Sequence, residues 1–236
     1  MLAVAFGVVA AQPQLEREAP FSARIGALSE PGGSFDTDNL ISNELSHLEV
    51  VPGLIERGVT GGAYVGVGPD QNFSYIARIR PSVAYIIDIR RDNLLLHLFF
   101  KAVFAEAPTR MDYLSVLLGR APPASEPVQP TAPLQALLDQ LERAEPLDRS
   151  QLRRRLESRV TASGVALTAS DRDTIARFHD TFVKAGVGLR FQSHGRPPQW
   201  YYPTYRHLLL AGDRDDRPWG YLADEEAYGF VRQLQA

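Results

Sequence analysis

The sequence predicts an α/β fold: a parallel β-sheet that is incomplete within this chain and carries a helical insertion. Residues 63–67 and 83–88 are short apolar runs, typical of strands buried on both faces. Between them, residues 72–80 repeat apolar side chains with helical spacing and end at Pro81. A strand, a helix and a second strand in this order indicate a Rossmann-like parallel unit. Two strands do not form a stable sheet alone, so we expect the chain to be the N-terminal part of a longer protein.

The remaining elements are predicted to be mainly helical. A helix over about 92–106 has an apolar stretch, residues 94–100, that implies deep burial. Further helical patterns cover about 134–143, 148–158, 171–184 and 224–234, and residues 189–191 suggest a short strand. The expected organisation is therefore a signal-like or irregular segment (1–34), a Rossmann-like nucleotide-binding half (35–120), a Pro-rich linker or loop (121–133) and a mainly helical region of the same domain (134–236).

Composition narrows the classes of protein. The chain has 236 residues, a net charge of −3 and no basic stripe interleaved with aromatic side chains, so no nucleic-acid partner is expected. Cysteine is absent, which excludes disulfides, thiolate zinc sites and cysteine nucleophiles. The histidines lack metal-ligand spacing, so no metal site is expected. No segment is long and apolar enough to span a membrane.

The start of the chain is apolar. Residues 2–11 read LAVAFGVVAA and end with the small residues that suit signal-peptide cleavage, although no Lys or Arg precedes them. Export or a periplasmic location is therefore slightly favoured over the cytoplasm. The alternative is an apolar N-terminal arm.

The chemistry is predicted at the turn after the first strand. Gly66 and Gly68 allow the backbone to turn tightly and to approach a ligand closely. The helix that follows points its free N–H groups at the same place. Asp88 ends the next strand 20 residues after Gly68, where an acidic side chain can accept hydrogen bonds from ribose hydroxyls. The alternative reading is structural: the glycines make a tight turn and Asp88 caps a helix.

The pattern favours S-adenosylmethionine (SAM) over NAD as the cofactor. The dinucleotide fingerprint requires a third small residue where this chain has Gln71, whereas SAM carries no phosphate and needs fewer glycines. Asp70, Gln71 and Asn72 stand at the helix start, where they can contact the methionine part of SAM or cap the helix. One departure counts against both cofactors, because Tyr64 and Val65 occupy the place where methyltransferases usually carry an acidic residue. SAM is the cofactor expected, and the methyl acceptor and catalytic residues are not predicted.

Five segments of the chain carry a resemblance: FDTDNLISNE (35–44), YVGVGPDQNF (64–73), IDIRR (87–91), YPTY (202–205) and LADE (222–225). They resemble a bacterial family of SAM-dependent methyltransferase-like proteins that carry a domain of unknown function. The resemblance spans roughly residues 30–236. It implies a SAM-methyltransferase-type fold and a ligand class, but no substrate, because the family has no established reaction.

Other polar and aromatic residues have two readings. The polar cluster of residues 36–44 could contact a ligand, but helix capping and turn chemistry are the favoured explanation. His97, within an apolar helix, is more readily explained as a core residue than as a catalyst. Arg90 and Arg91 could pair with Asp88 or with an acidic acceptor. The aromatic tract 200–205 could line an acceptor pocket or form a packed loop.

Three functions follow from these observations. The first is a SAM-dependent methyltransferase-like protein that binds SAM at the glycine turn with Asp88 on the ribose. The second is a non-catalytic ligand- or partner-binding protein that keeps a nucleotide-binding fold. An NAD-linked oxidoreductase is the least favoured. A small-molecule ligand is expected, and the oligomeric state is left open.

Overall fold

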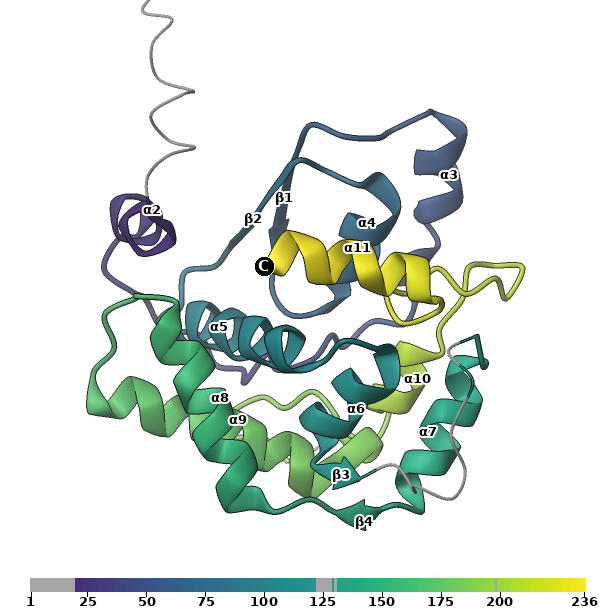
Figure 1. Ribbon diagram of the computed structural model, residues 1–236. Helices are drawn as coiled ribbons and strands as arrows, with labels where there is room; N and C mark the ends of the chain where they lie inside the picture. The colour runs from purple at the N-terminus through teal and green to yellow at the C-terminus, as the bar shows by residue number, and fades with distance from the viewer. Residues whose placement is uncertain (1–19, 122–128, 130, 198) are drawn as a thin grey trace, which may run out of the picture.

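The computed structural model describes residues 20–121, 129, 131–197 and 199–236 (Figure 1). It is a mostly helical α/β structure with one parallel sheet of two strands and one short antiparallel hairpin. In chain order, the elements are α2 (Phe21–Leu28), η1 (Ser46–Leu48), α3 (Val51–Glu56), β1 (Ala63–Val67), α4 (Gln71–Ile79), β2 (Val83–Ile87), α5 (Arg91–Glu106), α6 (Arg110–Leu118), β3 (Arg120–Ala121), α7 (Leu134–Glu142), β4 (Glu145–Pro146), α8 (Arg149–Ala162), α9 (Ala169–Ala185), η2 (Gly186–Gly188), α10 (Tyr205–Leu209) and α11 (Glu225–Gln235).

The predicted β–α–β unit is confirmed. β1 and β2 are adjacent and parallel, with Val65 opposite Tyr85, and α4 joins them. α4 ends where Arg80 takes a left-handed conformation before Pro81, as the sequence predicts for a helix stopped by proline. The sheet places the carboxyl ends of both strands at one edge, together with Gly68 and Asp88.

The larger Rossmann-like sheet is not present in the described residues. Beyond β1 and β2, the ladder pairing there is limited to the β3–β4 hairpin and two isolated bridges. The physical reason is that the chain after β2 continues mainly with helical periodicity, so it adds α5 to α9 rather than a third strand of this sheet. The strand expected at residues 189–191 is reduced to a single bridge between Arg190 and Thr204.

The predicted helices are confirmed as α5, α7, α8, α9 and α11, with ends shifted by a few residues. α5 is the centre of the core, because it contacts α6, α8, α9 and α11. Its apolar stretch is buried as expected, with Phe99 and Phe100 fully inaccessible. One continuous cluster of buried apolar side chains runs from Leu40 to Val231. In the described part of the chain, no helix is both long and apolar enough to cross a membrane.

Candidate functional site

The glycine turn is closed by the protein's own side chains. Gly68 has a φ of +87°, a conformation that favours glycine, as the turn prediction requires. A Cβ on Gly66 would lie 2.1 Å from the Oδ1 atom of Asn72 and 2.7 Å from the ring of Tyr64. The space that Gly66 leaves is therefore filled by Asn72 and Tyr64.

The side chain of Asn72 stabilises the glycine turn through hydrogen bonds. Its side-chain amide donates hydrogen bonds to the carbonyl oxygens of Val67 and Pro69 at 3.0 and 2.8 Å, and its Oδ1 accepts one from the Tyr64 hydroxyl at 2.7 Å. The Nε2 atom of His97 lies 2.8 Å from the carbonyl oxygen of Gly68. Burial lowers the pKa of His97 to about 4, so the ring is neutral and Nε2–H donates this bond. Asn72 and His97 thus hold the turn in shape.

Asp88 is paired with Arg90. The two carboxylate oxygens accept bonds from Nε and Nη2 of Arg90 at 2.9 and 2.8 Å, and the Arg90 backbone N–H donates a third at 2.9 Å. Only 7% of the Asp88 side chain is exposed. Burial acts to raise the pKa of Asp88, but the hydrogen bonds and charge of Arg90 outweigh it and bring the pKa below its usual value. Arg91 instead pairs with Asp171 of α9.

The segment before η1 lies across this edge. Arg90 donates a bond to the carbonyl oxygen of Thr37 at 3.0 Å, and Thr37 bridges to Ser193. The backbone N–H of Asp38 bonds the carbonyl oxygen of Gln192 at 3.0 Å. The polar cluster at 36–44 therefore lies at the carboxyl ends of the strands, where a segment that closes over a ligand would lie. In this structure, the segment itself occupies the space at that edge.

Asp70 is the centre of a buried polar cluster. Its Oδ2 atom accepts bonds from the hydroxyls of Tyr205 and Tyr221 at 2.7 and 3.1 Å, and Tyr221 also bonds Tyr113 at 3.3 Å. Burial raises the pKa of Asp70 to about 6 against the two tyrosine hydrogen bonds, which lower it. The aromatic tract of the sequence contributes Tyr205 to this cluster. Tyr113 and Tyr221 were not predicted, since nothing local in the sequence marks them.

A hollow of about 20 Å³ lies beside Asp70. Ser42, His47 and Gln71 contribute to its walls, and the buried Oε1 atom of Gln71 has no hydrogen-bond partner among the described residues. This volume accommodates a water molecule and is far smaller than a nucleoside. Of the predicted site residues, Asp70 and Gln71 therefore meet at a small hollow, whereas Asp88 belongs to a separate ion pair.

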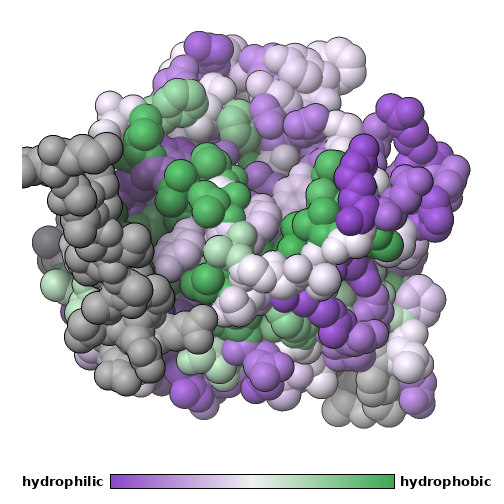
Figure 2. Space-filling view, turned by 90° about the horizontal axis from the view of Figure 1, so that it is seen from above, coloured by the Kyte–Doolittle hydropathy of each residue, from purple (hydrophilic) through white to green (hydrophobic). Residues whose placement is uncertain are grey.

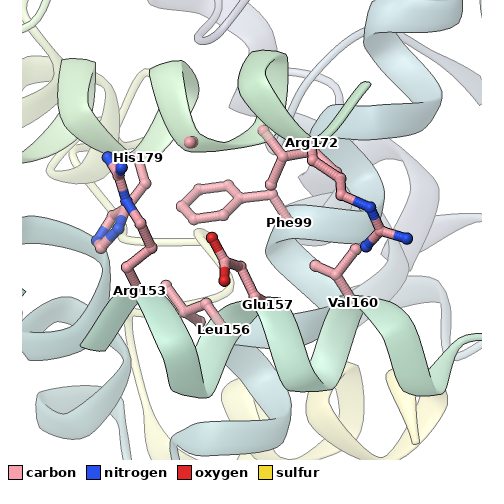
Figure 3. Close-up of a pocket in the computed structure, with 9 residues that line it drawn as sticks. Phe99, Arg153, Leu156, Glu157, Val160, Arg172 and His179 are labelled. Atoms are coloured by element: carbon pink, nitrogen blue, oxygen red, sulfur yellow. The ribbon is translucent and has the colours of Figure 1, made fainter. Parts of the chain in front are cut away.

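A second hollow, of about 30 Å³, lies between α8 and α9 over Phe99 of α5 (Figure 3). Its walls are mainly apolar, and Arg153 and Arg172 stand near its two ends. Arg153 is engaged by Asp180 at 2.8 Å, and His179 is hydrogen-bonded to the carbonyl oxygen of Val116 at 3.0 Å. No predicted site residue lines this hollow, and we regard it as a gap in helix packing.

The outer face of the β1–β2 sheet is apolar and open to solvent. Alternate residues of both strands point outward and Ile89 continues the row, whereas Tyr64, Ala84 and Ile86 pack inward against the core. We call this surface the open face. Apolar side chains gather at the surface over this part of the molecule (Figure 2). The open face consists of Val65 (63% exposed), Val67 (61%), Tyr85 (37%), Ile87 (55%) and Ile89 (62%).

In a comparison with known families, the segment that contains the β–α–β unit matches a domain of unknown function. Residues 40–122 match the family model of that domain, DUF7790. The match covers β1, α4, β2, α5 and α6, and so includes the glycine turn, the Asp88–Arg90 pair and the open face. The match supports one part of the resemblance, the presence of a domain of unknown function. It shows no link to methyltransferases. No curated protein matches the chain.

Proposed function

We propose that this protein is a non-catalytic binding protein whose partner packs on the open face. The observation that supports this most is the five apolar side chains on one sheet face, with exposed fractions between 37% and 63%. Parallel sheets are normally covered on both faces, and a contiguous exposed apolar patch is typical of an interaction site. Here α4 and the core cover one face alone.

The contacts around the glycine turn favour binding over cofactor chemistry. Each carboxylate oxygen of Asp88 already accepts a charged hydrogen bond from Arg90. Asn72 occupies the space beside Gly66, and the hollow at Asp70 is water-sized. A SAM molecule would have to displace the segment around Thr37 and part the ion pair, at a cost of several kcal/mol.

Binding of SAM at the turn is the second candidate function. It is favoured by one specific arrangement: Gly68, the start of α4 and Asp88 lie at the same edge of a parallel pair. In that case Gly66, Gly68, Asp70, Gln71, Asn72 and Asp88 would form the cofactor site.

The open face is tested by paired surface variants. We expect the wild-type protein to capture one reproducible partner when it is cross-linked in the source cells. The double variant Val65→Lys with Ile87→Lys should abolish this capture, because charge on the face prevents apolar packing. The matched control, Val59→Lys with Trp200→Lys, changes two exposed apolar residues outside the open face and should retain capture. Equal capture by all three proteins contradicts the proposal.

Thermal melts decide between the two candidates. We expect SAM and S-adenosylhomocysteine to leave the wild-type melting temperature unchanged. We also expect Asp88→Ala to lower the melting temperature without ligand, because it leaves the buried Arg90 unpaired. A SAM-induced shift that Asp88→Ala removes, with an unchanged ligand-free melt, would instead establish the cofactor site. In that case Asp88→Ala should weaken SAM at least about tenfold, the loss of two charged hydrogen bonds.

A further inference from the structure

We propose that the apolar run at the start of the chain, residues 2–11, packs on the open face and competes there with the partner. The inference rests on the proposed function only for the competition, since covering of the face by residues 2–11 stands by itself. Three features support this covering: the composition of the segments outside the described residues, the distance that residues 12–19 can span, and the size of the face.

The composition of residues 2–11 matches that of the open face. The segments outside the described residues are 1–19, 122–128, 130 and 198. Among them, the run LAVAFGVVAA at 2–11 consists of apolar residues and glycine, whereas 12–19 is largely polar and the internal ones are proline-rich or proline. An apolar face in water gains most by burying an apolar segment, at about 25 cal/mol per Å². Residues 2–11 are therefore the part of this chain whose chemistry fits the face.

Residues 12–19 are long enough to bring this run to the open face. The described chain begins just before α2, which lies on the side of the sheet away from α3 and α4 (Figure 1). Shortly after α2, the backbone N–H of Gly33 donates a bond to the carbonyl oxygen of Ile89 at 2.6 Å, at one end of the open face. Residues 12–19 can extend over roughly 26 Å. The face itself measures only about 16 by 10 Å, from five residues per strand and two strands.

The size of the face also disfavours a second copy as the occupant. A patch of these dimensions is well below the roughly 800 Å² per partner that a stable dimer buries, so a second copy, like any protein partner, would also need contacts outside the open face. A segment on the same chain needs less area, because a short linker gives it an effective concentration in the millimolar range. The geometry therefore favours intramolecular cover.

Disulfide trapping tests this inference in the full chain, which has no cysteine of its own. We expect Phe6→Cys with Val65→Cys, and Val8→Cys with Ile87→Cys, to form disulfides within a monomer under mild oxidation. The matched control, Phe6→Cys with Trp200→Cys, places the second thiol at a residue that is 85% exposed and outside the face, and should stay largely reduced. Non-reducing peptide mass mapping reads each link.

The contrary outcomes are distinct. Disulfides between two chains would make a second copy the occupant. Equal linking in the control, Phe6→Cys with Trp200→Cys, would show that residues 2–11 do not pack on the face. Either result overturns the inference, as does a purified protein whose mass shows that residues 1–11 have been removed.

An apolar dye provides a second readout. Removal of residues 2–11 should raise anilinonaphthalene sulfonate fluorescence severalfold, and adding Val65→Lys with Ile87→Lys should cancel the rise. Unchanged fluorescence on removal overturns the inference. Trapping without any captured partner would leave this inference standing while the proposed function fails, and capture without trapping would do the reverse.

Discussion

Asp70 shows at the scale of one residue how burial sets chemistry. The side chain caps no helix N–H, and its carboxylate faces tyrosine hydroxyls from segments more than 130 residues further along the chain. Because its pKa is raised to about 6 from an unfolded value of 3.8, the native state holds a proton that the unfolded state releases between these pH values. The native state is therefore destabilised, relative to a neutral side chain, as pH rises through 6.

We expect Asp70→Asn to remove this pH dependence. Two pKa units correspond to roughly 3 kcal/mol at neutral pH, so the variant should gain stability relative to wild type between pH 4.5 and 7.5. Urea unfolding at both pH values measures the difference. Tyr221→Phe is the complementary change: it removes a hydrogen bond to the ionised carboxylate and should steepen the loss. A wild-type-to-Asn difference that does not vary with pH would contradict the raised pKa.

Contacts with distant parts of the chain decided between the alternative roles predicted for single residues. Arg90 was one of two candidates to pair with Asp88, and the structure selects it because Arg91 turns to Asp171 on α9. The preferred core reading of His97 fits its partly buried position against the rings of Phe73 and Phe100. The roles of Gly66, Gly68 and Asp88 toward a ligand stay predictions.

At the scale of elements, α6 depends on an arginine that the sequence analysis did not single out. Arg110 is 1% exposed and donates to the carbonyl oxygens of Leu222, Ala223 and Ala132, each at 3.0 Å. It also pairs with Glu225 at 3.1 Å. It therefore ties α6 to the start of α11 and to the residues before α7.

We expect Arg110→Met to lower the free energy of unfolding by roughly 3–5 kcal/mol, because it leaves buried carbonyl groups without their donor. Arg153→Met is the control: its ion pair with Asp180 is about half exposed, so the change should cost less than about 1 kcal/mol. Urea unfolding monitored by circular dichroism compares the two. Similar losses for both variants would show that Arg110 does not join these elements.

At the scale of the whole molecule, the sheet unit and the helical region share one core. The apolar cluster includes residues of α4, α5, α8, α9 and α11 without a break. Both parts contribute side chains to this one cluster. That residues 134–236 belong to the same domain as residues 35–120 stays a prediction.

We therefore expect a single cooperative unfolding transition. Trp200→Phe leaves Trp219, beside α4, as the one tryptophan of the chain, so its fluorescence reports on the sheet unit. Circular dichroism reports mainly on the helices. Their thermal midpoints should coincide, as in two-state unfolding. Two separated midpoints would instead show two independently folding parts.

The sequence by itself determined the local architecture of this protein. The β1–α4–β2 unit, the positive φ of Gly68 and most helix positions follow from the spacing of apolar residues, glycines and prolines within about 20 residues. α6 was not among the predicted helices, although the sequence carries signals of the same kind there. These are a capping box at Thr109 and Asp112 and the turn at Gly119. Only the tertiary structure decided that the sheet has two strands in the described residues, that Asp70 meets Tyr205 and Tyr221, and that one sheet face stays open. Such contacts join residues far apart in the chain, and packing of the whole core selects them, so no local pattern encodes them.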